Sequence, residues 1–243
     1  MLKARYNSLN GLYVTPEKFM ALAGPDFRAR GIFPYCPSCK ERVDPYGVHS
    51  PNVRSRFDHQ NLAEGVDPLD DCLEANRSDR FRGMHADDWD DERGIALREQ
   101  FFETENLKQT YGFCLALCRK GNLSAVDFAA LIRRADRKNI WAYKDIPLWI
   151  IPYVLLTLGN FGLTATTQYA FHFVLKKSKA KSLSELWAEP EKPFSLCKVF
   201  SNSGEEIRTS GNPWPISHQF IAETAGDTSW MHQKLIDAFG KAR

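Results

Sequence analysis

The most regular pattern of apolar and polar positions lies in the second half of the chain. From Asp90 onward, apolar residues recur every three or four positions, which is the spacing of one face of a helix. Gly121 favours a helix end, and Ser124 with Asp127 resembles a capping box. The pattern predicts two successive amphipathic helices. Their apolar faces comprise Leu107, Tyr111, Cys114, Leu115 and Cys118 in the first, and Phe128, Leu131, Ile132 and Ala135 in the second.

A third helical segment is the most apolar part of the sequence. It runs from Pro147 to Leu158, and its composition predicts burial on every side, with a kink or a restart at Pro152. The longest apolar stretch, from Ile146 to Leu158, has 13 residues, fewer than the ~20 needed to span a bilayer. The N-terminus also has no apolar signal core. We therefore expect a soluble, cytoplasmic protein that has no membrane partner.

Strands are expected on both sides of this helical region. Residues 169–175 are aromatic and β-branched, and residues 194–200 alternate before a turn, with 205–208 as a hairpin partner. Near the start, residues 11–14 and 31–35 also suit strands. The helices expected at the two ends of the chain are 17–23, preceded by Thr15 as N-cap and Pro16, and 230–239.

Between these parts, residues 36–90 are rich in Pro, Gly, Asn and Asp and have poor hydrophobic periodicity. A compact domain rarely keeps about 50 such residues without something to organise them. A bound metal is one candidate. We therefore predict an α+β protein with two parts, a small module with an acidic loop over 1–89 and a mainly helical domain with a short antiparallel sheet over 90–243.

Composition and charge exclude the extremes. The chain has 243 residues, of which 43% are hydrophobic and 26% charged, so general disorder is excluded. A chain of this length buries roughly 70–75% of its unfolded surface, so folding does not demand a metal or disulfides. The net charge of +2 does not by itself indicate nucleic acid. Its distribution is uneven, with +4 over residues 1–60, −8 over 61–92 and +6 over the remainder.

The placement of the cysteines is the main chemical signal. Cys36-Pro-Ser-Cys39 is a Cys-x-x-Cys knuckle, whose two thiolates can hold one Zn²⁺, although redox pairs have the same spacing. Cys114, Cys118 and Cys197 suit a core. The side chains that offer further metal ligands downstream of the knuckle are His49, His59, Cys72 and His85.

A family resemblance orders these ligands. The segment 33–43, followed by Arg56-Phe-Asp-His59, resembles the N-terminal zinc-ribbon module of competence-protein (CoiA-like) proteins, over roughly residues 1–75. The resemblance implies a structural Zn²⁺ and a source in a bacterium, a phage or a mobile element. The ligands that it implies are Cys36, Cys39, His59 and Cys72, with His49 as the rival of Cys72 for the fourth position.

Two nuclease hypotheses follow from the same region. The family often continues into a restriction-type nuclease, which needs Glu-x-Lys on a strand, and this sequence contains no Glu-x-Lys. The order of His59, Asn76 and His85 also fits an HNH-like, metal-dependent nuclease. However, His59 cannot serve both zinc and catalysis. We therefore expect a protein without catalytic residues and keep the HNH-like nuclease as an alternative.

Basic side chains favour a binding role. They accompany aromatic residues around the knuckle, follow the strand at 169–175, and lie on the C-terminal half of the second amphipathic helix; this pattern suits phosphate contact and base stacking. We predict a zinc-containing, nucleic-acid-associated protein. The residues expected to contact nucleic acid are Arg54, Arg56, Lys176, Lys177 and Lys179, and the helix cluster comprises Arg133, Arg134, Arg137 and Lys138.

The alternative is a protein partner, with the chain acting as an adaptor or inhibitor on a defence complex. The acidic stretch 87–92 and an exposed Trp214 between two prolines suggest it. Acidic residues also suit the start of a helix, which is the simpler interpretation of 87–92.

Overall fold

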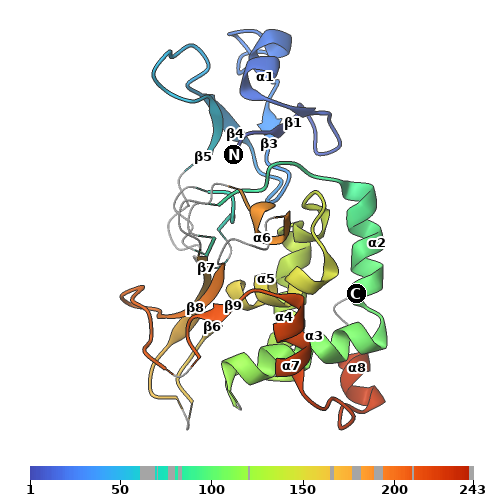
Figure 1. Ribbon diagram of the computed structural model, residues 1–243. Helices are drawn as coiled ribbons and strands as arrows, with labels where there is room; N and C mark the ends of the chain where they lie inside the picture. Colours follow the sequence, from blue (N-terminus) through green and yellow to red (C-terminus); the bar gives the residue numbers. More distant parts are fainter. Residues whose placement is uncertain are drawn as a thin grey trace.

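The computed structural model is α+β, with helices and small antiparallel sheets (Figure 1). It describes residues 1–60, 69, 71–75, 80–81, 84–119, 121–164, 167–176, 182–188, 194–209 and 211–240. The predicted fold class is therefore confirmed. No helix within these ranges is both long enough and apolar enough to cross a membrane.

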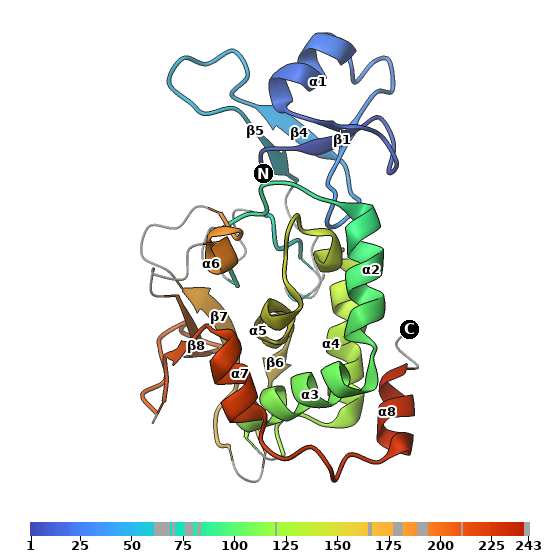
Figure 2. The ribbon, with the colours of Figure 1, turned by 45° about the vertical axis from the view of Figure 1, so that its right-hand side comes forward.

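The N-terminal elements gather at one end of the molecule (Figures 1 and 2). They form two antiparallel sheets, with strand orders β2-β1-β3 and β4-β5, and one helix. The elements are β1 (Ala4–Tyr6), β2 (Tyr13–Val14), α1 (Pro16–Ala23), β3 (Pro34–Tyr35), β4 (Val43–Tyr46) and β5 (Arg56–His59). As predicted, α1 begins at Pro16 after a Thr15 cap, whose side chain accepts from the Lys18 amide at 3.3 Å.

Aromatic side chains hold this part together. Phe19 of α1 is fully buried, and its ring packs edge-on against Phe27 at 5.3 Å and against Phe57 at 6.1 Å between centroids. These aromatic side chains belong to the main core of the described residues. The same core includes Phe128 and Phe239 of the helical part. The division of the chain near residue 89 remains a prediction.

The helices beyond this module are α2 (Asp91–Phe101), α3 (Thr104–Cys118), α4 (Ala125–Arg137), α5 (Ile151–Thr157), α6 (Glu185–Ala188), α7 (His218–Ala225) and α8 (Gln233–Gly240), with the 3-10 turns η2 (Ile140–Ala142) and η3 (Leu148–Ile150). Among these helices, α3 and α4 pack against α5. The helix restart near Pro152 and the burial of every residue of α5 are confirmed. The predicted capping box of Ser124 and Asp127 begins α4.

A four-stranded antiparallel sheet packs beside α5, on the side away from α2 (Figure 2). Its order is β6-β7-β8-β9, with β6 (Asn160–Phe161), β7 (Phe171–Lys176), β8 (Ser195–Phe200) and β9 (Trp214–Pro215).

Residues 205–207 return beside β8 as the predicted hairpin partner, although they are too few to form a named strand. Glu206 bridges Val199, the Phe200 amide donates to the Glu205 carbonyl at 2.9 Å, and the Ile207 amide donates to the Lys198 carbonyl at 2.9 Å. A side chain continues this pairing. The Asn212 amide donates to the carbonyls of Lys198 at 3.0 Å and Ile207 at 2.6 Å, and its oxygen accepts from the Lys198 amide at 2.9 Å. The side-chain amide of Asn212 thus bonds to the backbone of Lys198 as a neighbouring strand would. Trp214 was expected to be exposed but is half-buried against the core.

Candidate metal centre

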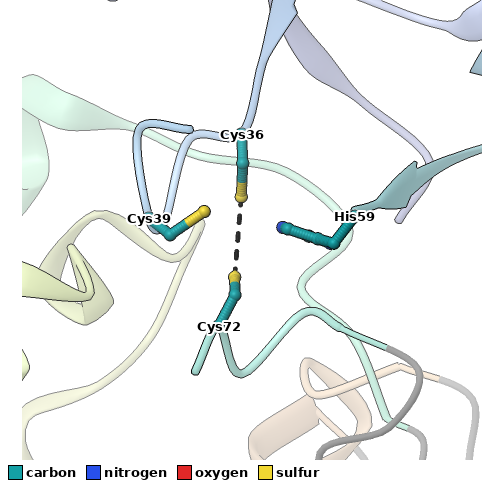
Figure 3. Close-up of side chains that lie close together, drawn as sticks. All are labelled: Cys36, Cys39, His59 and Cys72. Atoms are coloured by element: carbon teal, nitrogen blue, oxygen red, sulfur yellow. Dashed lines mark hydrogen bonds between the residues drawn. The ribbon is translucent and has the colours of Figure 1, made fainter. Parts of the chain in front are cut away.

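Three separate segments bring four ligand side chains together (Figure 3). Cys36 and Cys39 lie on the turn after β3, His59 ends β5, and Cys72 lies in the described stretch 71–75. Their ligating atoms all lie within 4.8 Å of one another. The sulfurs of Cys36 and Cys72 are 3.7 Å apart, which is about the edge of a tetrahedron with Zn–S bonds of ~2.3 Å.

The knuckle is shaped by its own backbone. The Cys36 amide donates to the Glu41 carbonyl at 2.8 Å, and the Lys40 amide donates back to the Cys36 carbonyl at 2.9 Å. Lys40 has a φ of 65°, a left-handed conformation that closes the turn. These bonds turn both cysteine side chains to one side, where Figure 3 shows their sulfurs facing His59 and Cys72.

The hairpin β4-β5 positions the imidazole. His59 pairs with Val43 at the end of the ladder, so its side chain lies at the hairpin end nearest the knuckle. Its Nε2 atom is buried and has no hydrogen-bond partner. A buried polar atom without a partner is costly in a folded protein. A metal ion at the centre of the four side chains would supply the missing partner, and the donor set of three sulfurs and one nitrogen fits such an ion.

The surroundings shift the pKa values of the three thiols in different directions. Burial raises the pKa of the Cys36 thiol, and hydrogen bonds with Cys36 and Cys39, together with burial, raise the pKa of Cys72. Hydrogen bonds from Cys36 and Cys72 lower the pKa of Cys39, which is only partly buried. Thiolates are the metal-ligating form, so a divalent metal bound here would displace thiol protons.

The four residues implied by the family resemblance are the four that the structure brings together. His49, the rival for the fourth position, is exposed in the loop after β4 and is not part of the cluster. Within the described residues, no other group of three or more such side chains meets at metal-binding distance.

The remaining predicted site residues are dispersed. Of the HNH-like set, His59 lies in the cluster, Asn76 lies outside the described residues, and His85 lies with its Nδ1 3.5 Å from the buried Glu74 carboxylate. The HNH-like arrangement therefore has no shared site among the described residues.

The predicted nucleic-acid contacts are also spread over the fold. Arg54 is exposed, and Arg56 forms a bidentate pair with Asp58 at 2.7 and 3.0 Å. Lys176 pairs with Glu206. Lys177 and Lys179 lie outside the described residues.

The basic cluster expected on the second amphipathic helix is not one surface. Arg134 donates to the Leu158 carbonyl at 2.7 Å, and Lys138 is only 5% exposed. Lys138 and the next residue, Asn139, instead reach towards the ligand loops, a role that the sequence did not indicate. No local signal distinguishes a buried lysine at a helix end from a solvated one. The acidic stretch 87–92, by contrast, does begin a helix, with Asp90 as the N-cap of α2.

The fold and the cluster together define an α+β protein with a Cys₃His group that can hold a metal ion. Comparison with known proteins adds no relative, because no protein-family model, no curated protein and no solved structure matches the chain.

Proposed function

We propose that Cys36, Cys39, His59 and Cys72 hold one structural Zn²⁺. The observation that carries the proposal is the convergence of three sulfurs and an orphaned imidazole nitrogen within 4.8 Å, from segments up to 36 residues apart. Soft thiolates with imidazole in a tetrahedral arrangement favour zinc over harder divalent ions. Four protein ligands leave no open position for water, so the ion is a structural element and does no chemistry.

The zinc ion fastens the knuckle, the β4-β5 hairpin and the Cys72 segment to one another. Apparent binding energies of structural zinc are ~10–16 kcal/mol near neutral pH. That energy exceeds what the short strands of this region supply, since β2 and β3 have only two residues each. We therefore expect the N-terminal module to depend on the metal more than the helices do.

Metal analysis of protein purified without a metal-affinity tag tests this proposal. The wild type should hold one zinc per chain, and Cys72→Ser should lose most of it. His49→Ala is the matched control, because His49 is an exposed ligand type in the same module and lies outside the cluster. A metal-free wild type would refute the zinc centre. An equal loss in His49→Ala would refute the ligand assignment.

We further propose that the zinc-stapled module associates with nucleic acid. Two arginines of the module stack on aromatic rings, Arg42 over Phe33 at 4.0 Å and Arg56 over Tyr46 at 4.4 Å. Arg42, just before β4, and Tyr46, at its end, are exposed, as is Arg54 in the loop between β4 and β5. Cationic side chains beside exposed rings are suited to phosphate contact and base stacking. The resemblance to the CoiA-like module, with its bacterial, phage or mobile-element source, is consistent with this proposal.

Binding of a labelled single-stranded oligonucleotide at several salt concentrations tests the association. Affinity should fall as salt rises, and the double variant Arg42→Gln/Arg54→Gln should weaken it. Arg208→Gln, which removes an exposed arginine of the other part of the chain, should not. Absence of binding at low salt would refute the proposal, and stoichiometric co-purification of one protein would instead support the adaptor alternative.

A further inference from the structure

The C-terminal end of α4 touches both ligand loops of the candidate metal centre. Lys138 follows the last residue of α4, and its ammonium group donates to the main-chain carbonyl of Asp71, the residue immediately before Cys72. The side chain is buried, with the residue only 5% exposed. A buried lysine therefore contacts the peptide bond that leads into the ligand residue Cys72.

The next residue reaches the other loop. Asn139 has a φ of 49°, a left-handed conformation that ends α4 and turns its side chain towards the knuckle. Its amide donates to the carbonyl of Pro37 at 3.1 Å, between Cys36 and Cys39. Two consecutive residues of the helical part thus hold the backbone beside three of the four ligands.

The proposed zinc centre carries a net negative charge, which a nearby cation would balance. One Zn²⁺, three thiolates and a neutral imidazole carry a net charge of −1. The buried carboxylate of Glu74, two residues beyond Cys72, adds a second negative charge, and it accepts from the Ala86 amide at 3.2 Å. Negative charge in a buried site is costly unless a cation lies close to it. The N-terminal ammonium interacts electrostatically with Glu74 and Cys36, and the Lys138 ammonium lies at the peptide bond that joins Asp71 to Cys72.

We propose that Lys138 is the counter-ion of the zinc–thiolate centre and that Asn139 positions its knuckle. This inference rests on the proposed zinc site. It makes the metal affinity of the N-terminal module a property of α4, which belongs to the other part of the chain. The competing explanation is that the charge of Lys138 serves groups other than the centre, such as the dipole at a helix C-terminus, which would affect stability and leave metal binding unchanged.

Zinc affinity, measured by competition with a chromophoric chelator on the full chain, separates the two explanations. Lys138→Met should weaken zinc binding by 10- to 100-fold, the range found when outer-shell partners of metal ligands are removed. Lys138→Arg should restore most of the affinity, because it keeps the charge. Asn139→Ala should weaken binding without changing the charge. Lys18→Met, which removes an exposed lysine of α1, is the control and should bind zinc like the wild type.

Cobalt substitution provides a second readout that a purely structural role would not move. Loss of a nearby positive charge makes the thiolates easier to oxidise, so the thiolate-to-cobalt charge-transfer bands should shift to lower energy in Lys138→Met and not in Lys138→Arg. Lys138→Gln keeps a hydrogen-bond donor for Asp71 but has no charge. It decides the question if the methionine variant does not fold.

The outcomes are distinct. A wild type that binds no zinc would overturn the metal centre and this proposal with it. A wild type that binds zinc, together with uncharged Lys138 variants of unchanged affinity and unchanged cobalt bands, would overturn the counter-ion alone. Weaker binding in both Lys138→Gln and Lys138→Arg would also overturn it, because geometry and not charge would then be responsible.

Discussion

Lys198→Met is expected to abolish a rise in stability that the wild type gains between about pH 8 and pH 10.5. Lys198 lies in β8 and is 3% exposed, and its ammonium donates to the carbonyl of Leu117 near the end of α3 at 3.1 Å. The same nitrogen lies 4.0 Å from the centroid of the Phe171 ring and 5.9 Å from that of Trp214. The charge is therefore held by a helix end and by aromatic faces, away from water.

Burial lowers the pKa of Lys198 to about 8, from an ordinary value of 10.5. Below pH 8 the lysine is protonated in both the folded and the unfolded chain, so the folded state bears the full cost of a buried charge. Between 8 and 10.5 the folded state releases the proton while the unfolded state keeps it, and stability rises with pH. At about 1.4 kcal/mol for each tenfold change, this difference amounts to roughly 3 kcal/mol.

Urea unfolding of the wild type and of Lys198→Met, followed by tryptophan fluorescence at pH steps from 7 to 10.5, measures this effect. The unfolding free energy of the wild type minus that of the variant should increase by roughly 3 kcal/mol over that range. Buried thiols and tyrosines also titrate there, but they are common to both proteins and cancel in the difference. A difference that stays constant with pH would show that Lys198 titrates normally, and the reasoning from burial would be refuted.

Three further substitutions test packing and capping, each by urea unfolding at pH 7. Phe19→Ala should cost about 3–5 kcal/mol, because a fully buried ring leaves a cavity in the N-terminal core; a cost below 1 kcal/mol would mean that this core is loosely packed. Gly112→Ala should cost about 1–2 kcal/mol, since the new Cβ would lie 2.8 Å from the Ala225 carbonyl oxygen. Gly162→Ala, which meets nothing within 4 Å, is the matched control and should change stability by less than about 0.5 kcal/mol. Ser124→Ala should cost about 1 kcal/mol through loss of the capping box, and no change would contradict that cap.

Some elements were readable from the sequence because their signals are local. The faces of α3 and α4 follow from apolar residues three and four apart, and the start of α4 follows from Ser124 and Asp127. The Cys36–Cys39 pair is equally local, since its spacing alone makes a knuckle.

Helix α7 was not predicted, and its packing explains why. It has only eight residues, with Ser217 as cap and Ile221 as its buried residue. A helix this short is marginal in isolation. It forms against α3, where the absence of a side chain at Gly112 lets the carbonyl of Ala225 approach. The stabilising contact thus joins residues more than 100 positions apart in the sequence.

The sequence by itself determined the faces of α3 and α4, the knuckle and a short set of downstream ligand types, because caps and periodicity act over a few residues. Only the tertiary structure decided that His59 and Cys72 meet the knuckle while His49 stays in solvent. It also decided that Lys138, which was expected in a basic helix cluster, and Lys198 are buried. The physical reason is the same in each case. Burial and ligand geometry depend on which distant segments pack together. Here the sheet packs against α5, and the two residues that follow α4 contact the loops of the candidate metal centre.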